Sequence, residues 1–391
     1  MITFEEALRI VTESSFRTGR EVVSLEEACG RVLAVPVRSD MDMPPWNKSA
    51  VDGYACRHTD LGHELRVLET IAAGAMPLKE VRQGECSRIM TGAAVPAGAD
   101  YVFMLEDSEE LPGGCVRFTG RPGNDNIAKA GEDIMKEQTV LRSGRYIRPQ
   151  DIAVLAAVGA MQVTVCCRAH VGVISTGNEL VEPDCVPAGA QIRNSNSSQL
   201  MAQLARAGAI GKYYGIARDE EESITKLMKM ALEENDLLLI SGGVSFGDFD
   251  LVPRVMRALG LTIHFNQVAM QPGKPLTFCT GEKKAVFGLP GNPVSTFLQF
   301  EVMVRAFLDR MAGVTEHAPV LQMPLATDYS RKRAERLSWI PCTITPAGEA
   351  MPVEYHGSAH ITALTTAWGV ITIPRGQSWI QKGEIVSVRQ I

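Results

Sequence analysis

The sequence lacks the charge surplus of a nucleic-acid-binding protein and the long apolar run of a membrane protein. Lys and Arg together number 39 and Asp and Glu number 45, which gives a net charge of −6. Binding to a nucleic-acid backbone or to an anionic membrane surface usually requires a basic surplus. The longest nearly apolar run covers 152–161 and is too short to cross a bilayer. We therefore expect no nucleic acid as the main partner and no membrane association.

The sequence also lacks the cysteine and histidine patterns of a zinc site. The nine cysteines are scattered, no C-x-x-C occurs, and none of the seven histidines forms an H-E-x-x-H motif. An odd number of cysteines, with Cys166 beside Cys167, favours free thiols in a reducing compartment. The first ten residues carry early acids and no cationic start before an apolar stretch, so we predict no signal peptide. These features favour a cytoplasmic protein.

The 391 residues suffice for several domains, and a content of 45% apolar and 21% charged residues is typical of a folded globular chain. Residues 3–17 have the apolar spacing of a helix, and Thr3 with Glu6 suits a capping box. Residues 24–30 and 149–158 are predicted as further helices, the latter with Pro149 in its first turn. We expect 1–40 and 135–168 to form one discontinuous helical N-terminal domain.

The rest of the chain consists of three segments with different residue patterns. Within 41–134, short β-like segments alternate with Gly, Pro and Asp, which predicts a β-rich inserted domain. Within 169–313, apolar strands alternate with amphipathic helices, which predicts an α/β domain with a mainly parallel sheet. Alternating β patterns within 314–391 predict a small C-terminal β domain. The fold class is therefore multidomain, α/β and β.

Three strand-to-helix junctions of the α/β domain are rich in small polar residues. Ligands of an open α/β sheet bind beyond the carboxyl ends of its strands, where glycines let backbone N–H groups approach an anion. A single such loop is often a plain turn, but three at one end of a sheet predict a site for a phosphate-bearing ligand. The junctions hold Ser175, Thr176, Gly177, Asn178 and Glu179; Ser241, Gly242, Gly243, Ser245, Asp248 and Asp250; and Pro290, Gly291, Asn292 and Pro293.

Acidic residues lie near glycines in several loops. Singly, each is more often a turn or cap residue than a ligand. Gathered around a phosphate, they would suit Mg²⁺, which prefers carboxylate and phosphate oxygens. The acids in question are Asp52, Asp133, Glu179, Asp219, Asp248 and Asp250.

Residues 243–247 also fit the G-x-S-x-G motif of serine hydrolases, with Ser245 as the nucleophile. A hydrolase needs a downstream acid and histidine, and four histidines follow the motif: His264, His317, His356 and His360. No histidine lies in a recognisable loop context, and the glycine pair before Val244 lengthens the turn. The phosphate site is therefore favoured over the hydrolase. No Walker A motif and no G-x-G-x-x-G occurs, so an ordinary NTPase or dinucleotide site lacks support.

Seven longer motifs carry a resemblance. They are MPPWNKSAVDGYA (43–55), RIMTGAAVPAGADYVFMLED (88–107), GEDI (131–134), STGNELVEP (175–183), QIRNSNSSQL (191–200), SGGVSFGDFD (241–250) and PGKPL with LPGNPVS (272–295). In these the chain resembles the MoeA family of molybdopterin molybdenumtransferases, which includes the E domain of gephyrin. The resemblance runs through the chain in family order and is weakest near the C-terminus.

The resemblance implies a fold and an activity. The α/β domain would be the MogA-like molybdopterin-binding domain, and the C-terminal domain would be β-barrel-like. The protein would be an elongated homodimer, with the inserted domain of one subunit closing over the α/β domain of the other. It would insert molybdenum from molybdate into adenylylated molybdopterin with Mg²⁺ and release AMP. Further partners would be a molybdopterin adenylyltransferase and the enzymes that receive the cofactor.

The resemblance also assigns residues. Lys274 matches the lysine of the PGKP stretch, which would help attract molybdate, and the dithiolene of the pterin rather than Cys279 would take the metal. The glycine-rich junctions would bind the pterin nucleotide. Asp52, Glu179 and Asp250 would hold the divalent ion. Positions matching acidic or hydroxyl residues of the family site are Asp52, Thr91, Asp133, Glu179, Asp219 and Asp250.

Three positions depart from the family pattern. Asn178 stands where aspartate is common, Gln271 where lysine is common and Ala128 where arginine is common. Loss of two charge-assisted hydrogen bonds of about 1.5–3 kcal/mol each would weaken anion binding by roughly 10²–10⁴-fold unless Lys129 or Arg193 compensates. The alternative function is therefore a weakened or non-catalytic paralogue that carries the pterin or acts as a scaffold.

Overall fold

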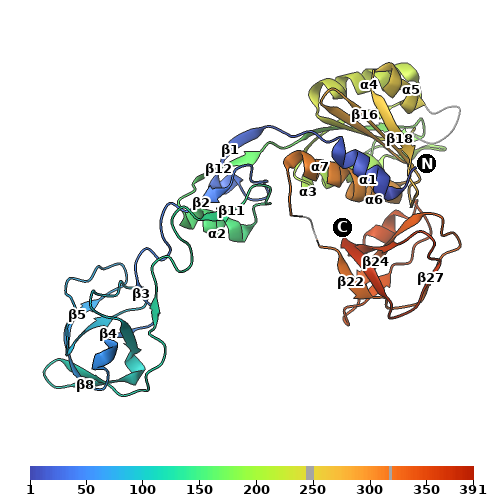
Figure 1. Cartoon of the computed structure of the whole chain (residues 1–391). Helices are drawn as coiled ribbons and strands as arrows, with labels where there is room; N and C mark the ends of the chain where they lie inside the picture. The colour runs from blue at the N-terminus through green and yellow to red at the C-terminus, as the bar shows by residue number, and fades with distance from the viewer. Residues whose placement is uncertain (244–250, 317–318) are drawn as a thin grey trace.

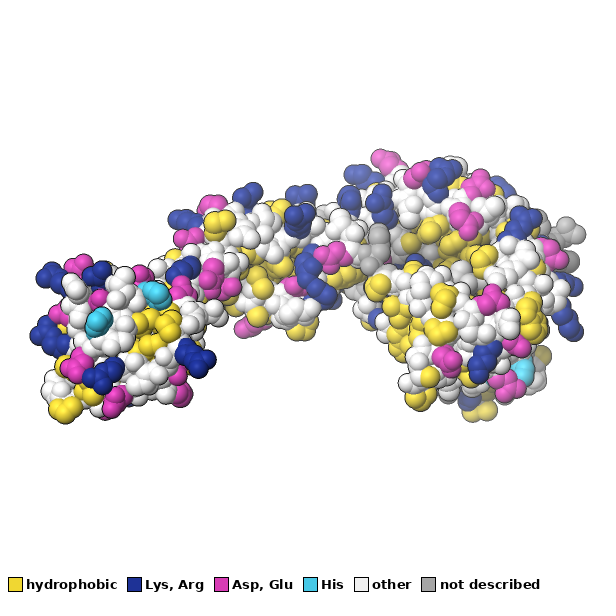
Figure 2. Space-filling view, turned by 60° about the horizontal axis from the view of Figure 1, so that its bottom comes forward, with side chains coloured by type: hydrophobic (Ala, Val, Ile, Leu, Met, Phe, Trp, Pro, Cys, Tyr) yellow, Lys and Arg dark blue, Asp and Glu magenta, His cyan; other side chains and the backbone are white. Residues whose placement is uncertain are grey.

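The computed structural model describes residues 1–243, 251–316 and 319–391. The molecule is elongated (Figures 1 and 2). A β-rich inserted unit lies at one end, a small middle unit follows, and an α/β unit lies at the other end beside a C-terminal unit (Figure 1). Among the described residues, no helix has the length and apolar character needed to span a bilayer.

The inserted unit is built on a six-stranded sheet with strand order β7-β4-β6-β5-β9-β8, which confirms the predicted β-rich insertion. Its core contains stacked rings of Tyr54 and Phe103, with centroids 5.4 Å apart. The strands are β4 (Gly53–Cys56), β5 (Glu64–Ile71), β6 (Glu85–Ile89), β7 (Tyr101–Met104), β8 (Ser108–Leu111) and β9 (Cys115–Phe118). The short helices η2 (His58–Asp60) and η3 (Leu105–Asp107) and the pair β3 (Lys48–Ser49) and β10 (Ile127–Ala128) complete it.

Two segments on either side of the insertion form the middle unit. Strand β1 (Arg20–Ser24) pairs with β12 (Gln162–Cys166), and β2 (Val37–Arg38) pairs with β11 (Thr139–Leu141), both antiparallel. Helix α2 (Pro149–Ala157) begins with Pro149 as predicted, and its Leu155 is buried in the core of this unit. The helix predicted over 24–30 is wrong in extent. Only a single turn, η1 (Leu25–Glu27), forms before Gly30 adopts a φ of 77°.

Helix α1 (Phe4–Glu13) forms where the sequence predicts a helix but is shorter. Thr3 caps it, since its hydroxyl accepts a hydrogen bond from the Glu6 N–H at 3.1 Å. Its buried face, with Phe4 and Val11, belongs to the core of the α/β unit rather than to that of the middle unit. This packing differs from the expected grouping of 1–40 with 135–168, and the four-domain division otherwise stays a prediction.

The α/β unit contains a six-stranded sheet with order β16-β13-β17-β21-β20-β18. Strands β16 to β21 in this order are parallel, whereas β20 and β18 extend the sheet in antiparallel fashion. The sheet is therefore mainly parallel, as predicted, and the antiparallel strand β20 lies outside the predicted alternation of strands and helices. The strands are β13 (His170–Thr176), β16 (Ile210–Ala217), β17 (Leu237–Ser241), β18 (Thr262–Gln267), β20 (Pro275–Gly281) and β21 (Lys284–Leu289).

Helices cover both faces of this sheet, which explains why residues 237–240 of β17 are all apolar and buried. Its Leu237 and Leu239 face the core shared with α1, and Leu238 and Ile240 face the opposite core. The helices of the unit are α3 (Ser195–Arg206), α4 (Glu221–Glu234), α5 (Leu251–Ala258), α6 (Pro293–Gln299) and α7 (Arg305–Ala312), with a π-helical turn η4 (Phe300–Val304) between the last two. Residues 293–312 thus form one continuous helix with a wider turn in its middle.

The C-terminal unit is an antiparallel sheet with order β24-β26-β28-β22 that continues into the α/β unit. The continuation is β19 (Met270–Gln271), which pairs in parallel with β24 and so ties the two units together. The strands are β22 (Leu321–Pro324), β23 (Tyr329–Ser330), β24 (Leu337–Ile344), β25 (Ala350–Pro352), β26 (Gly369–Ile373), β27 (Trp379–Ile380) and β28 (Ile385–Gln390), with the short helix η5 (Ile361–Leu364). This confirms the predicted C-terminal β domain.

Candidate functional site

The carboxyl ends of β13, β17 and β21 lie side by side. Ser175 is in register with Ser241, and Ser241 is in register with Leu289. The three predicted loops therefore follow neighbouring strands, and they line a shared cavity of about 1250 Å³, which we call the main cavity. Predicted residues in its wall are Thr176, Gly177, Glu179, Asp219, Ser241, Gly242, Gly243, Lys274, Pro290, Gly291, Asn292 and Pro293.

The loop after β13 is locked to the loop after β16 by a reciprocal pair of hydrogen bonds. The Asn178 N–H donates to Asp219 Oδ2 and the Asp219 N–H donates to Asn178 Oδ1, both at 3.2 Å. Glu179 folds back over Gly177, where a Cβ atom would lie 2.7 Å from Glu179 Oε2. Gly177 also has a φ of 150°, so the loop requires glycine there. These contacts hold the Glu179 and Asp219 carboxylates at the cavity.

The loop after β17 begins with two glycines that pack against Thr176. Gly242 and Gly243 have φ angles of 94° and 63°, and a Cβ on Gly242 would collide with the Thr176 carbonyl oxygen. Only glycine therefore lets the chain turn here. The Thr176 hydroxyl is buried and has no hydrogen-bond partner in the described part of the chain. Ser245, Asp248 and Asp250 lie outside the described residues.

The start of α3 supplies two asparagines, Asn194 and Asn196, that are not among the predicted site residues. Asn194 caps the helix by accepting from the Ser197 N–H at 3.3 Å, and Ser175 Oγ donates to Asn194 Oδ1 at 3.1 Å. Ser175 is therefore fully buried behind the wall rather than in it. Asn196 Nδ2 donates to Ser241 Oγ at 2.7 Å and to the carbonyl of Gly291 at 2.8 Å, so it joins the second and third loops. The run of small polar residues at 194–198, at the start of an amphipathic helix, is the sequence feature that could have indicated these two asparagines.

The third loop is braced from two sides. Thr296 in α6 donates to the Pro290 carbonyl at 2.5 Å. Asn292 Nδ2 donates to Ser358 Oγ at 2.8 Å, so a loop of the C-terminal unit also forms part of the cavity wall. Lys274 also lines the main cavity, with an exposed side chain, just before β20.

Among the described residues that line the main cavity, three side chains are basic and two are acidic. Arg193, Arg254 and Lys274 line it together with Glu179 and Asp219. Arg254 pairs with Glu221 outside the wall at 2.8 Å. The Lys274 carbonyl accepts from the Val268 N–H at 3.0 Å, but its ammonium group makes no hydrogen bond or ion pair within the described ranges. Cationic side chains and glycine turns at the ends of parallel strands suit a phosphate or another oxyanion.

The other predicted residues, Asp52, Thr91 and Asp133, lie in the inserted unit or at its base, far from the main cavity of the same chain (Figure 1). Asp52 Oδ1 accepts from the Thr91 N–H at 2.6 Å and from its hydroxyl at 2.7 Å. These two hydrogen bonds, the backbone one first, lower the pKa of Asp52. Asp133 is exposed, and its N–H donates to the Met43 carbonyl at 3.0 Å. One chain therefore does not bring Asp52 together with Glu179.

The departing positions also lie apart from one another. Ala128 pairs with Lys48 at the base of the inserted unit, and the neighbouring Lys129 is bound to Asp125 at 2.8 Å. Gln271 lies in β19, and its Oε1 is buried without a partner among the described residues. Arg193 does line the main cavity. Across the described residues, no group of three or more His, Cys, Asp and Glu side chains is arranged to hold a metal ion.

Three family models match the chain. They are the MoeA N-terminal region (domain I and II) over residues 2–159, a probable molybdopterin binding domain over 172–310, and the MoeA C-terminal region (domain IV) over 322–391. A protein of Staphylococcus aureus (strain Mu50) named molybdopterin molybdenumtransferase is 32% identical over 397 residues, covering 99% of this chain and 95% of that protein. A Staphylococcus epidermidis protein of the same name is 32% identical over 400 residues, with the same coverage.

Solved structures agree with these matches. The crystal structure of the molybdopterin biosynthesis MoeA protein from Pyrococcus horikoshii OT3 superimposes with a TM-score of 0.87 at 30% identity, covering the whole of both chains. A molybdenum cofactor biosynthesis protein from Pyrococcus furiosus shares the fold with a TM-score of 0.65 at 21% identity, also over both whole chains. The match therefore includes all four regions of the molecule.

Proposed function

The chain belongs to the MoeA family, and on that premise we propose that it acts in molybdenum cofactor biosynthesis as a molybdopterin molybdenumtransferase. It takes adenylylated molybdopterin and molybdate, inserts molybdenum into the pterin dithiolene and releases AMP. The observation that carries the proposal is the main cavity, where three glycine-containing loops and Lys274 meet at the carboxyl end of the sheet. The full-length family match does not favour a carrier or scaffold role instead.

The cavity offers separate groups to the two anionic parts of the reaction. The Gly242 N–H donates to the Leu289 carbonyl at 3.0 Å. Backbone N–H groups near Gly243 and Gly291 suit the phosphates of the pterin nucleotide, since glycine permits close approach of the backbone. The Thr176 hydroxyl, which has no partner among the described residues, is a further donor beside them. Lys274 suits the molybdate oxyanion, because an ammonium group attracts an oxyanion without demanding one geometry. A positive field that is already in place when negative charge develops lowers the barrier to bond cleavage.

Mg²⁺ suits the carboxylates at the cavity, because this ion binds one or two carboxylates together with substrate phosphates and water. Glu179 would hold it from the main cavity, and Asp52 would come from a second copy of the chain. Asp250, which lies outside the described residues, is the third proposed ligand. Bound there, the ion would neutralise the phosphoanhydride. The two hydrogen bonds from Thr91, which lower the pKa of Asp52, also fix the orientation of its carboxylate.

A homodimer follows from the same proposal. Asp52, Thr91 and Asp133 lie at the other end of the elongated chain from Glu179 and Lys274, so they act on one substrate only if two copies combine. We further propose a cytoplasmic location, which the nine free cysteines support. An adenylyltransferase that supplies the nucleotide and enzymes that receive the cofactor are the expected partners.

The direct test mixes the protein with adenylylated molybdopterin, Mg²⁺ and either molybdate or tungstate. We expect AMP release by chromatography and metal bound to the pterin by elemental analysis. Lys274→Ala should raise the oxyanion concentration needed for half-maximal rate about 10-fold or more, since a hydrogen bond to a charged group contributes about 1.5–3 kcal/mol. The matched control is Lys229→Ala, which removes an exposed lysine of α4 and should leave AMP release unchanged. AMP release no higher than in buffer would refute the proposal.

A further inference from the structure

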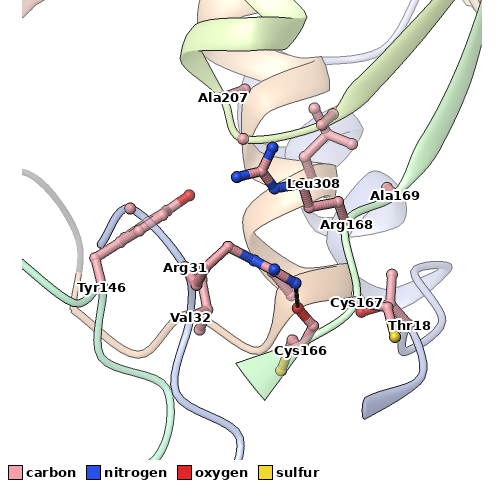
Figure 3. A pocket seen from close by; sticks show the side chains of 14 residues that line it. Thr18, Arg31, Val32, Tyr146, Cys166, Cys167, Arg168, Ala169, Ala207 and Leu308 are labelled. Atoms are coloured by element: carbon pink, nitrogen blue, oxygen red, sulfur yellow. Dashed lines mark hydrogen bonds between the residues drawn. The ribbon is translucent and has the colours of Figure 1, made fainter. Parts of the chain in front are cut away.

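A second hollow lies where the middle unit meets the α/β unit, away from the main cavity. It consists of two adjoining spaces of about 360 Å³ and about 30 Å³ that share Tyr146 and Arg168 in their walls. Arg206 and Arg305 line the larger space, and Arg31 lines the smaller one. We call this hollow the junction cavity. Figure 3 shows Arg31, Arg168 and Tyr146 around a common space, each from a different segment of the chain.

Three of the four arginines already have a carboxylate partner. Arg31 is only 8% exposed and donates to Glu21 and, at 2.8 Å, to the Cys166 carbonyl. Arg206 pairs with Glu301, and Arg305 pairs with Asp309 at 3.2 Å. These pairs hold the guanidinium groups in place at the wall.

Arg168 is different from the other three. It makes no hydrogen bond and no ion pair with any residue in the three described stretches of the chain. Four guanidinium groups therefore face three carboxylates, and the remaining positive charge is that of Arg168. The Tyr146 hydroxyl is a further polar group in the wall, and it donates a hydrogen bond to Asp309 Oδ1 at 3.3 Å.

We propose that the junction cavity binds a phosphate group, with Arg168 as its principal ligand. Guanidinium groups present planar pairs of N–H donors that match phosphate oxygens, and such charge-assisted bonds are strong. The larger space has room for a free phosphate ion and for the phosphate end of a nucleoside monophosphate. Because the two units supply different walls, an occupied cavity would hold the middle unit and the α/β unit together. This site is separate from the catalytic proposal and does not depend on it.

The test measures binding of inorganic phosphate and of AMP by titration calorimetry at low salt, in the Lys274→Ala background to weaken binding at the main cavity. We expect Arg168→Ala to weaken binding at least about 10-fold, which corresponds to about 1.4 kcal/mol. The control Arg142→Ala removes an exposed arginine of the middle unit and should bind like the parent. Arg168→Lys should recover part of the affinity, because it restores the charge without the planar donor pair.

The two ligands distinguish the source of the phosphate group. Equal affinities would assign free phosphate, and tighter binding of AMP would assign a nucleotide. Arg168→Gln replaces Arg168→Ala if the latter does not fold, as judged by its thermal unfolding curve. Binding that is absent in the parent, or unchanged in both Arg168→Ala and Arg168→Gln, would overturn the proposal. Neither result would bear on AMP release at the main cavity.

Discussion

A heterodimer with Asp52→Asn in one copy and Lys274→Ala in the other should regain the activity that each variant homodimer loses. Asp52 belongs to the inserted unit and Lys274 to the main cavity, at opposite ends of one chain (Figure 1). In a two-fold symmetric dimer, each active site would combine the inserted unit of one copy with the main cavity of the other. One site of the heterodimer then carries both substitutions, and the other carries neither.

The expected magnitude follows from this count of sites. The heterodimer should have about half the AMP-release rate of the wild-type dimer, because one of its two sites is intact. Each homodimeric variant should fall by about 10-fold or more, since both of its sites lack a charged contact. Asn keeps the shape of Asp52 and retains an oxygen for the two hydrogen bonds from Thr91, so the loss would not come from a disturbed loop.

The heterodimer can be isolated by expressing the two variants with different affinity tags and purifying on both. AMP release per dimer is then compared with that of the two homodimers and of a heterodimer of wild type with Asp52→Asn, which should also reach about half. A rate no higher than that of the homodimers would refute the shared site and place any role of Asp52 within its own chain. Full activity of the Asp52→Asn homodimer would refute the role altogether.

Three further outcomes test the local chemistry. Gly242→Ala should destabilise the fold by about 1–3 kcal/mol in denaturant unfolding, because its φ of 94° and a nearby carbonyl exclude a Cβ atom; Gly291→Ala, with open space around it, should change stability by less than about 0.5 kcal/mol. Thr91→Val should raise the lowered pKa of Asp52 towards its ordinary value of 3.8, so that its carboxylate is lost at a higher pH on acidification, as an NMR titration would detect. Phe278→Ala should cost about 3–5 kcal/mol of unfolding free energy, because the ring is fully buried among other aromatic rings.

The convergence of the three loops could be predicted because it follows from topology. Apolar strand segments such as 237–240 alternate with amphipathic helices, and that pattern favours a parallel sheet. Parallel strands end at the same edge, so polar loops after β13, β17 and β21 had to meet there. Gly177, Gly242 and Gly243 in these loops each adopt a backbone conformation and make a close contact that a Cβ would block, whereas Gly291 has open space around it.

Contacts between segments that are distant in the sequence could not be predicted in the same way, because no sequence pattern marks them. Strand β20 begins with a proline and follows directly on the PGK turn, so no alternation marks it as a partner of β21. Asn196 looks like one of several polar residues opening a helix until its bonds to Ser241 and Gly291 are seen. The four arginines of the junction cavity come from segments that share no motif, and only the packing of the two units brings them together.

The three departures from the family pattern have unequal consequences in the structure. Asn178 keeps the loop intact, because its side-chain oxygen accepts the Asp219 N–H as a carboxylate oxygen would, while its backbone N–H binds Asp219 in return. Ala128 belongs to the base of the inserted unit. The positive charge that is lost there therefore does not come from the main cavity of the same chain. Gln271 lies on the strand that joins the α/β and C-terminal units, two residues before the wall formed by Gly273 and Lys274. Among the described residues, the positive charge of the main cavity comes from Arg193, Arg254 and Lys274. The loss of anion affinity expected from the absent cations at Ala128 and Gln271 therefore cannot be assigned to this cavity alone.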